Sequence, residues 1–214
     1  MTALCSAAVD KGISGICITD ACDMEEFEEQ KYGKRLMYSC FAAHKAQDIF
    51  SQQLIVTNGV EMCQPLADPD RAVQVIGENR FDFVLGSLHK TRKYGDMMML
   101  NYAHPALDLQ DVFRSYYEEL LEVVQWGHFD SLAHLGYPLR YLKPYNRTVD
   151  LAQIDDVFAE IMKSLVAQGK ALELNTGGLR MEIEAFTPSN KYLQMYKDYG
   201  GEMITIGSDA ECCS

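Results

Sequence analysis

Six polar or metal-binding residues stand at the ends of short apolar segments spread along the chain. In order they are Asp20, Glu61, His89, His134, Asn175 and Asp209. If each apolar segment is a strand of a parallel sheet, the carboxyl ends of the strands meet on one face, and residues far apart in sequence become neighbours. Carboxylates and imidazoles gathered in one pocket are typical ligands of hydrolytic metal sites. The pattern therefore predicts a metal-dependent hydrolytic centre.

The apolar segments alternate with stretches of helical periodicity. The expected strands are Gly15–Thr19, Leu54–Val60, Phe81–Leu88, Asp130–Leu135, Ala171–Asn175 and Met203–Gly207. The expected helices are Thr2–Lys11, Lys34–Gln53, Asp68–Glu78, Leu107–Gln125, Asp150–Gln168 and Pro188–Tyr199. A parallel pair of strands needs a crossover long enough to contain a helix, so this alternation predicts an α/β fold with helices covering a parallel sheet.

Length and composition narrow the class of protein. The 214 residues, 48% of them apolar, suit one domain that spans residues 1–214. There is no apolar run of membrane-spanning length and no charged leader, so we expect a cytoplasmic protein without a membrane partner. The net charge of −12 argues against nucleic acid as the main partner. The oligomeric state stays open.

The segments around the six polar residues resemble the polymerase-and-histidinol-phosphatase (PHP) superfamily, and they follow its order. These segments are Ile18–Asp20, Gly59–Glu61, Gly86–His89, Leu132–Leu135, Leu172–Thr176 and Ile206–Ala210. Phe81–Ser87, His134–Tyr141 and Asn175–Arg180 are most similar to the histidinol-phosphatase branch. This resemblance covers nearly all of the chain. It implies a distorted barrel of seven βα units that holds two or three divalent ions of zinc, iron or manganese.

The resemblance also implies a role for each metal-binding residue. Glu61 is similar to a bridging carboxylate ligand, and His89 and His134 are similar to imidazole ligands. Asp209 is similar to a further carboxylate ligand of the catalytic centre. Alternatives remain for all four. Glu61 could be a solvated residue after a strand, the histidines could make only structural hydrogen bonds, and Asp209 could close a turn.

Two arginines supply positive charge in an acidic chain. Arg140 and Arg180 follow predicted strand ends, and a guanidinium offers a planar fork of donors that fits phosphate oxygens. The resemblance implies that both contact the substrate phosphate, whereas the alternative is a surface salt bridge. The expected reaction is metal-assisted hydrolysis of a small phosphate monoester, with L-histidinol phosphate as the favoured substrate and histidine biosynthesis as the pathway.

The chain also departs from the family pattern. Ala21 and Glu211 stand where the family has histidines, and no strand with a His-x-His pair precedes Met1. We therefore expect a PHP-type barrel without its first strand and last helix, with incompletely bound metals and little activity as the chain stands. Two alternatives follow: a catalytically impaired remnant that still binds metal or phosphate, or a PHP phosphoesterase with another substrate.

Overall fold

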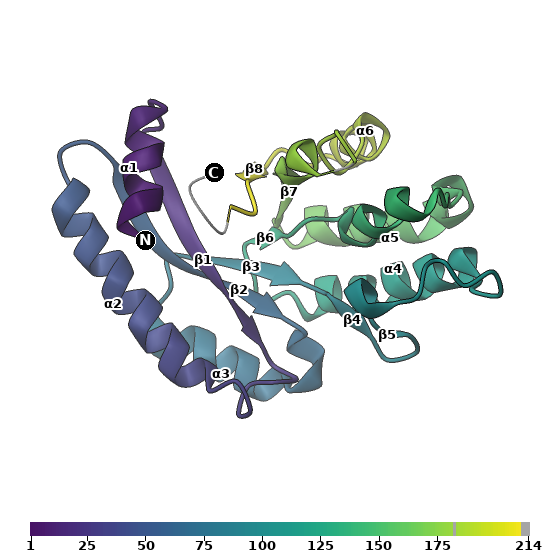
Figure 1. Cartoon of the computed structure of the whole chain (residues 1–214), viewed down its shortest axis with the longest axis horizontal. Helices are drawn as coiled ribbons and strands as arrows, with labels where there is room; N and C mark the ends of the chain where they lie inside the picture. The colour runs from purple at the N-terminus through teal and green to yellow at the C-terminus, as the bar shows by residue number, and fades with distance from the viewer. Residues whose placement is uncertain (182, 211–214) are drawn as a thin grey trace. The chain divides into compact units, whose positions relative to one another are not determined.

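The computed structural model of the chain describes residues 1–181 and 183–210. These residues form two compact units. The first contains residues 1–85, 128–130 and 210, and the second contains residues 86–127 and 131–209. In Figure 1 the first unit is mostly purple and blue, and the second runs from teal to yellow.

The first unit is built from helices and parallel strands in strict alternation. Its elements are α1 (Thr2–Asp10), β1 (Gly15–Asp23), α2 (Tyr32–Phe50), β2 (Ile55–Cys63), α3 (Pro69–Asn79) and the start of β3 (Phe83–Ser87). β1 and β2 are parallel over nine residue pairs, from Gly15 beside Ile55 to Asp23 beside Cys63. The side chain of Asp68 accepts a hydrogen bond from the backbone N–H of Arg71, which caps the start of α3.

A small apolar cluster holds α1 and α2 to the strands. Its fully buried members are Cys5, Ala8, Ala46, Leu54 and Val56. Partly buried apolar side chains from β1 and from the end of α2 pack against them. The cluster removes apolar surface of both helices from water, and this burial is the main favourable term in folding.

Gly59, in the middle of β2, is required by a close approach of its neighbours. A Cβ at this position would lie 2.7 Å from Cys17 Sγ, 2.7 Å from the carbonyl oxygen of Phe83 and 2.8 Å from Thr19 Cγ2. We expect Gly59→Ala to destabilise the protein by about 1–3 kcal/mol through overpacking. Gly77→Ala is the matched control, because that helical position is open and alanine there should stabilise by roughly 0.5–1 kcal/mol. Urea unfolding measures both changes, and equal midpoints for the two variants would contradict the prediction.

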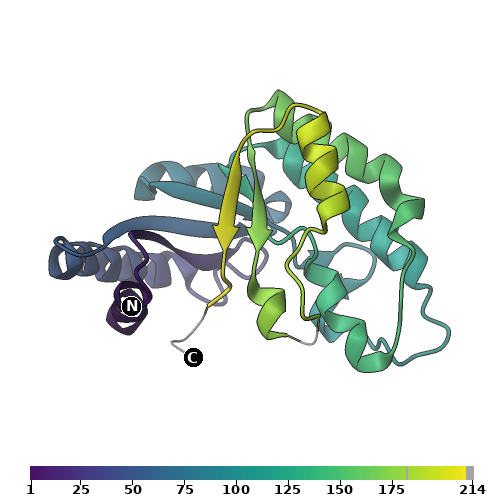
Figure 2. The ribbon, with the colours of Figure 1, turned by 90° about the horizontal axis from the view of Figure 1, so that it is seen from above.

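The second unit repeats the same alternation. Its elements are the end of β3, β4 (Lys90–Thr91), β5 (Gly95–Asp96), α4 (Leu109–Trp126), β6 (Ser131–Leu132), α5 (Asp155–Ala167), β7 (Ala171–Asn175), α6 (Asn190–Asp198) and β8 (Ile204–Gly207). The strand order within this unit is β3-β6-β7-β8, and β6, β7 and β8 run parallel. Figure 2 shows β7 and β8 side by side. β4 and β5 form a separate antiparallel pair.

Aromatic side chains join the three long helices of this unit, which run side by side in Figure 1. The ring centroids of Tyr117 on α4 and Phe158 on α5 are 4.3 Å apart. The ring of Phe158 also stacks on that of Tyr192 on α6, at 4.0 Å. The hydroxyl of Tyr192 donates to Asp155 at the start of α5, so this buried ring also satisfies its polar end.

The structure confirms the α/β alternation and corrects several boundaries. β7 has the predicted bounds. β1 and β2 extend beyond the predicted ends, so Asp20 and Glu61 lie inside strands instead of after them. The segment Leu151–Ile154, predicted as helical with α5, is a separate 3-10 turn capped by the side chain of Asp150. No helix within the described residues is both long and apolar enough to span a membrane.

Candidate metal and phosphate site

Two imidazoles face each other in the second unit. His89 lies between β3 and β4, and His134 lies two residues after β6. Their Nε2 atoms are 3.2 Å apart, and the rings are stacked with centroids 5.1 Å apart. Neighbouring nitrogen ligands of a tetrahedral zinc ion are separated by roughly 3.3 Å, since each zinc–nitrogen bond is about 2.0–2.1 Å long. The spacing of the two nitrogen atoms therefore matches that of two ligands of one divalent ion. Metal binding by His89 and His134 stays a prediction.

The backbone at His134 has an unusual conformation with a clear cause. Its φ is +23°, a value that non-glycine residues rarely adopt. The N–H of His134 donates to Glu173 Oε2 at 2.6 Å, and its carbonyl accepts from the N–H of Tyr137 at 2.8 Å. The chain thus leaves the sheet directly after Leu132. For this reason the strand predicted at Asp130–Leu135 is only two residues long.

Glu173 is a buried carboxylate that sequence reasoning did not single out. It lies in the middle of β7 and is only 3% exposed. Its Oε2 accepts hydrogen bonds from the His134 backbone and from Asn175 Nδ2, the latter at 2.9 Å. Burial raises the pKa of the Glu173 carboxyl above its usual value, and the nearby His134 opposes this shift. The sequence feature that could have pointed to Glu173 is its charge, which stands inside the otherwise apolar segment Ala171–Leu174.

Tyr137 is a second residue that the sequence did not identify. It begins a short 3-10 helix, Tyr137–Tyr141, just after His134. Its ring centroid lies 4.5 Å from that of His89 and 5.1 Å from that of His134. The guanidinium carbon of Arg140 is 5.3 Å from the same ring centroid. Tyr137 therefore packs against both imidazoles and places a cation beside them.

Arg140 connects the ends of β7 and β8. Its guanidinium donates to the carboxylate of Asp209, two residues after β8, and approaches Asn175 Oδ1 at 3.4 Å. The side chains of Arg140 and Asp209 are only 11% and 24% exposed, so the pair is well shielded from solvent. The N–H of Gly177 donates to Asn175 Oδ1 at 2.9 Å. These groups form a compact polar cluster in the same unit as the two histidines.

Arg180 takes a more exposed position. It ends the 3-10 helix Gly177–Arg180, and its guanidinium donates to the carbonyl of Ser208, beside Asp209. Both predicted phosphate-binding arginines thus contact the segment that follows β8. Contact of either arginine with a phosphate stays a prediction.

The remaining predicted ligand lies in the first unit. Glu61 is half-buried near the end of β2, and Ala21 on β1 is its partner in the parallel register. One residue before Ala21, the carboxylate of Asp20 accepts a hydrogen bond of 2.5 Å from Ser39 Oγ. Metal binding by Glu61 stays a prediction. Glu211 lies outside the described residues.

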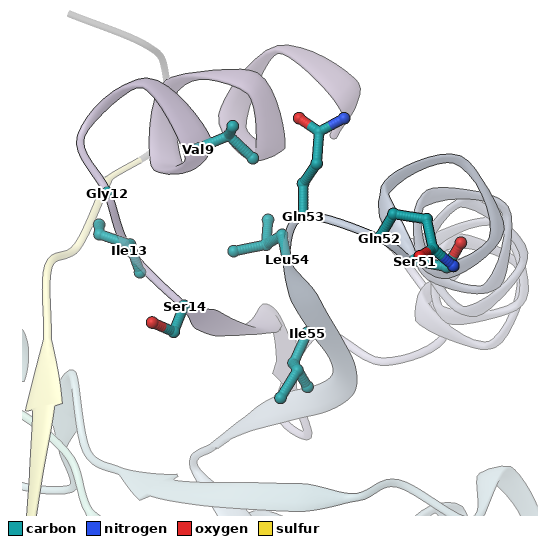
Figure 3. Close-up of a pocket in the computed structure, with 9 residues that line it drawn as sticks. All are labelled: Val9, Gly12, Ile13, Ser14, Ser51, Gln52, Gln53, Leu54 and Ile55. Carbon is teal, nitrogen blue, oxygen red and sulfur yellow. The ribbon is translucent and has the colours of Figure 1, made fainter.

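A shallow cavity of about 300 Å³ lies at the amino ends of β1 and β2, away from Glu61 near the carboxyl end of β2. The residues that line it are Val9, Gly12, Ile13, Ser14, Ser51, Gln52, Gln53, Leu54 and Ile55 (Figure 3). Among these described residues there is no carboxylate, imidazole or guanidinium. The cavity also lies at the amino ends of β1 and β2, whereas sites in parallel βα folds are built at the carboxyl ends. It offers no hydrolytic chemistry.

The PHP domain family matches residues 1–177 of the chain. A histidinol-phosphatase of Lactococcus lactis is 27% identical over 208 residues, which are 95% of this chain and 75% of that protein. A probable histidinol-phosphatase of Thermotoga maritima is 33% identical over 141 residues, covering 66% of this chain and 53% of that protein.

Solved structures resemble the whole described fold. One is the Lactococcus lactis histidinol phosphate phosphatase complexed with zinc, L-histidinol and phosphate, which is 25% identical with a TM-score of 0.73. The match covers 98% of this chain and 79% of that one. A putative histidinol phosphatase of Listeria monocytogenes has a TM-score of 0.77 at 15% identity, covering 97% of this chain and 88% of that one.

Proposed function

Because this chain belongs to the PHP family, we propose that it is a metal-dependent phosphatase that hydrolyses L-histidinol phosphate to L-histidinol, a step of histidine biosynthesis. One observation carries this proposal: the paired imidazoles of His89 and His134 pack against the ring of Tyr137, and the same ring contacts the guanidinium of Arg140. The similarity to an enzyme bound to zinc, histidinol and phosphate supports the substrate. The likeness to solved structures also confirms the expected PHP-type α/β fold.

The metal ligands that we propose are two imidazoles and two carboxylates. His89 and His134 would hold an ion through their imidazoles, and Asp209 and Glu61 would be further ligands of a centre of two or three zinc, iron or manganese ions. When bound, such ions supply a Lewis acid for the phosphate and lower the pKa of a water molecule. The chain's own contribution is to fix the ring planes of the histidines, which Tyr137 does by packing against both.

The phosphate binds, in this proposal, to Arg140 and Arg180. Arg140 donates from one Nη atom to Asp209 and to Asn175, and its guanidinium carries further N–H donors that can bind an oxyanion in a fork geometry. Arg180 adds charge from a more exposed position and contributes less. A small phosphate ester is therefore the partner.

A cytoplasmic location agrees with the free thiols of Cys5, Cys17, Cys22 and Cys40.

The test is a comparison of substrates. With zinc present, kcat/KM for L-histidinol phosphate should exceed that for bis(p-nitrophenyl) phosphate, because a diester lacks the second charge that the arginines neutralise. A preference for the diester would favour another PHP phosphoesterase. Binding of zinc and phosphate without hydrolysis of either compound, measured as phosphate from the monoester and p-nitrophenol from the diester, would favour the impaired remnant.

Ala21 provides a prediction about metal affinity. Because Ala21 and Glu61 are register partners on parallel strands, their side chains lie on the same face of the sheet. Ala21→His places an imidazole beside that carboxylate, so we expect zinc affinity to rise by at least about tenfold. Residues that only hydrogen-bond to metal ligands already change metal affinity by about this factor. Turnover should rise with zinc affinity. Ala21→Leu controls for side-chain size, and equal zinc affinity in Ala21→His and Ala21→Leu would contradict the prediction.

A further inference from the structure

A series of hydrogen bonds, buried at Glu173 and partly buried at Arg140, connects the candidate metal ligand His134 with the candidate phosphate ligand Arg140. It runs from the His134 N–H to Glu173, then to the amide of Asn175, and from that amide to Arg140. We propose that Glu173 is a positioning residue that fixes both ligands at once, without touching metal or substrate. This inference rests on the proposed function and deepens it.

Glu173 acts first on the backbone of His134. The positive φ of His134 is unfavourable for a side chain with a Cβ and persists only where the surroundings determine it. The bond of 2.6 Å from its N–H to Glu173 Oε2 joins residues 39 positions apart and is buried. A charged acceptor forms stronger hydrogen bonds than a neutral one. Glu173 thus holds the backbone turn that aims the imidazole at His89.

Glu173 also acts on the side-chain amide of Asn175. Its Nδ2 donates to the same carboxylate oxygen at 2.9 Å, which determines which end of the amide carries oxygen. The other end, Oδ1, accepts from the N–H of Gly177 at 2.9 Å and lies 3.4 Å from Arg140. A flipped amide would direct its donors at two other donors and leave Glu173 facing an acceptor. Glu173 therefore sets the orientation of Asn175 and, through it, one contact of Arg140.

The packing around Glu173 leaves space for its carboxylate. Gly207 on β8 packs directly against Glu173, because a Cβ at Gly207 would collide with Glu173 Oε1. The fold leaves room for the carboxylate at a position where an apolar residue would avoid the cost of burying a charge. Neighbouring positions of β7, such as the fully buried Leu172, are apolar. The charge at Glu173 is consistent with a role in the site and is not required by the core.

Two substitutions separate hydrogen bonding from charge. Glu173→Gln keeps a carbonyl oxygen that can accept both bonds, whereas Glu173→Leu has a similar size and no acceptor. Leu172→Ala is the matched control, because this buried neighbour points to the other face of β7 and its loss lowers stability without touching the hydrogen bonds. Gly207→Ala is an independent probe that displaces the Glu173 carboxylate without removing it.

The measurements are zinc affinity by competition with a chelating dye, affinity for inorganic phosphate, and the melting temperature. We expect Glu173→Leu and Gly207→Ala to weaken zinc and phosphate binding by about 10–100-fold each, the range known for residues that orient metal ligands. Glu173→Gln should weaken both affinities less than Glu173→Leu does, because it keeps an acceptor for both hydrogen bonds and loses only the charge that strengthens them. Leu172→Ala should have a lower melting temperature, with unchanged affinities for zinc and phosphate.

Three results would overturn the inference. They are wild-type affinities in both Glu173→Leu and Gly207→Ala, an equal loss of affinity in Leu172→Ala, or a wild-type chain that binds neither zinc nor phosphate. Failure of the proposed function looks different. In that case the wild-type chain binds zinc and phosphate, and the variants change both affinities as expected, but histidinol phosphate is not hydrolysed.

Discussion

Replacing His134 with alanine should lower zinc-dependent hydrolysis of histidinol phosphate by at least about a hundredfold, since even changes outside the ligand shell cost 10–100-fold in metal affinity. The variant removes one of two nitrogen atoms that face each other at 3.2 Å and leaves His89 as a single imidazole. Zinc content, measured after gel filtration, should fall together with turnover.

The control for this substitution is His44→Ala. His44 is an exposed residue of α2, and its ring nitrogen lies 2.8 Å from the carbonyl oxygen of Cys40. It has no part in the proposed site, so zinc content and turnover should stay at the wild-type level. Equal losses in His44→Ala and His134→Ala would show that the effect is not specific to the paired imidazoles. Full zinc content in His134→Ala would show that His134 is not a zinc ligand.

Replacing Arg140 with alanine should have the second largest effect. A hydrogen bond to a charged group contributes about 1.5–3 kcal/mol, which corresponds to a loss of roughly 10–200-fold in phosphate affinity. The loss should appear in KM for histidinol phosphate and in inhibition by inorganic phosphate. Arg140→Lys should recover only part of it, because an ammonium group keeps the charge but not the planar fork.

Arg180→Ala provides the comparison for Arg140. Arg180 is exposed, and exposed charges are screened by salt, so its loss should cost less than that of Arg140 at physiological ionic strength. In both variants the loss of phosphate affinity should be the main effect, and the fall in melting temperature should be the smaller effect. An Arg140→Ala variant with unchanged phosphate affinity and lower stability would assign Arg140 only to its ion pair with Asp209.

Local patterns predicted most of the fold because its elements are periodic over many residues. The helix predicted at Leu107–Gln125 is found at Leu109–Trp126, with Asp108 as its cap. β6 was the main error. Its predicted continuation through His134 fails because the N–H of His134 bonds to Glu173, a partner 39 residues away. No local pattern contains that information.

Contacts between residues far apart in sequence also explain why Tyr137 and Glu173 were not predicted as part of the site. His89 and His134 were predicted together, and the structure brings their nitrogen atoms within 3.2 Å. Tyr137 and Glu173 are recognisable only from their contacts, because a tyrosine in a loop and a glutamate in a strand have many possible roles. The roles of all six predicted site residues stay predictions: Glu61, His89, His134, Asp209, Arg140 and Arg180.

The most direct test of the account is release of phosphate from histidinol phosphate by the chain and by Ala21→His, after removal of metals and during titration with zinc. We expect no release without metal, and a rate that rises with zinc and stays below the ordinary enzyme range of about 1 per second for the unmodified chain. Ala21→His should reach a higher rate at lower zinc concentration. Release that continues in excess chelator, or none from either protein at saturating zinc, would contradict a metal-dependent histidinol-phosphate phosphatase.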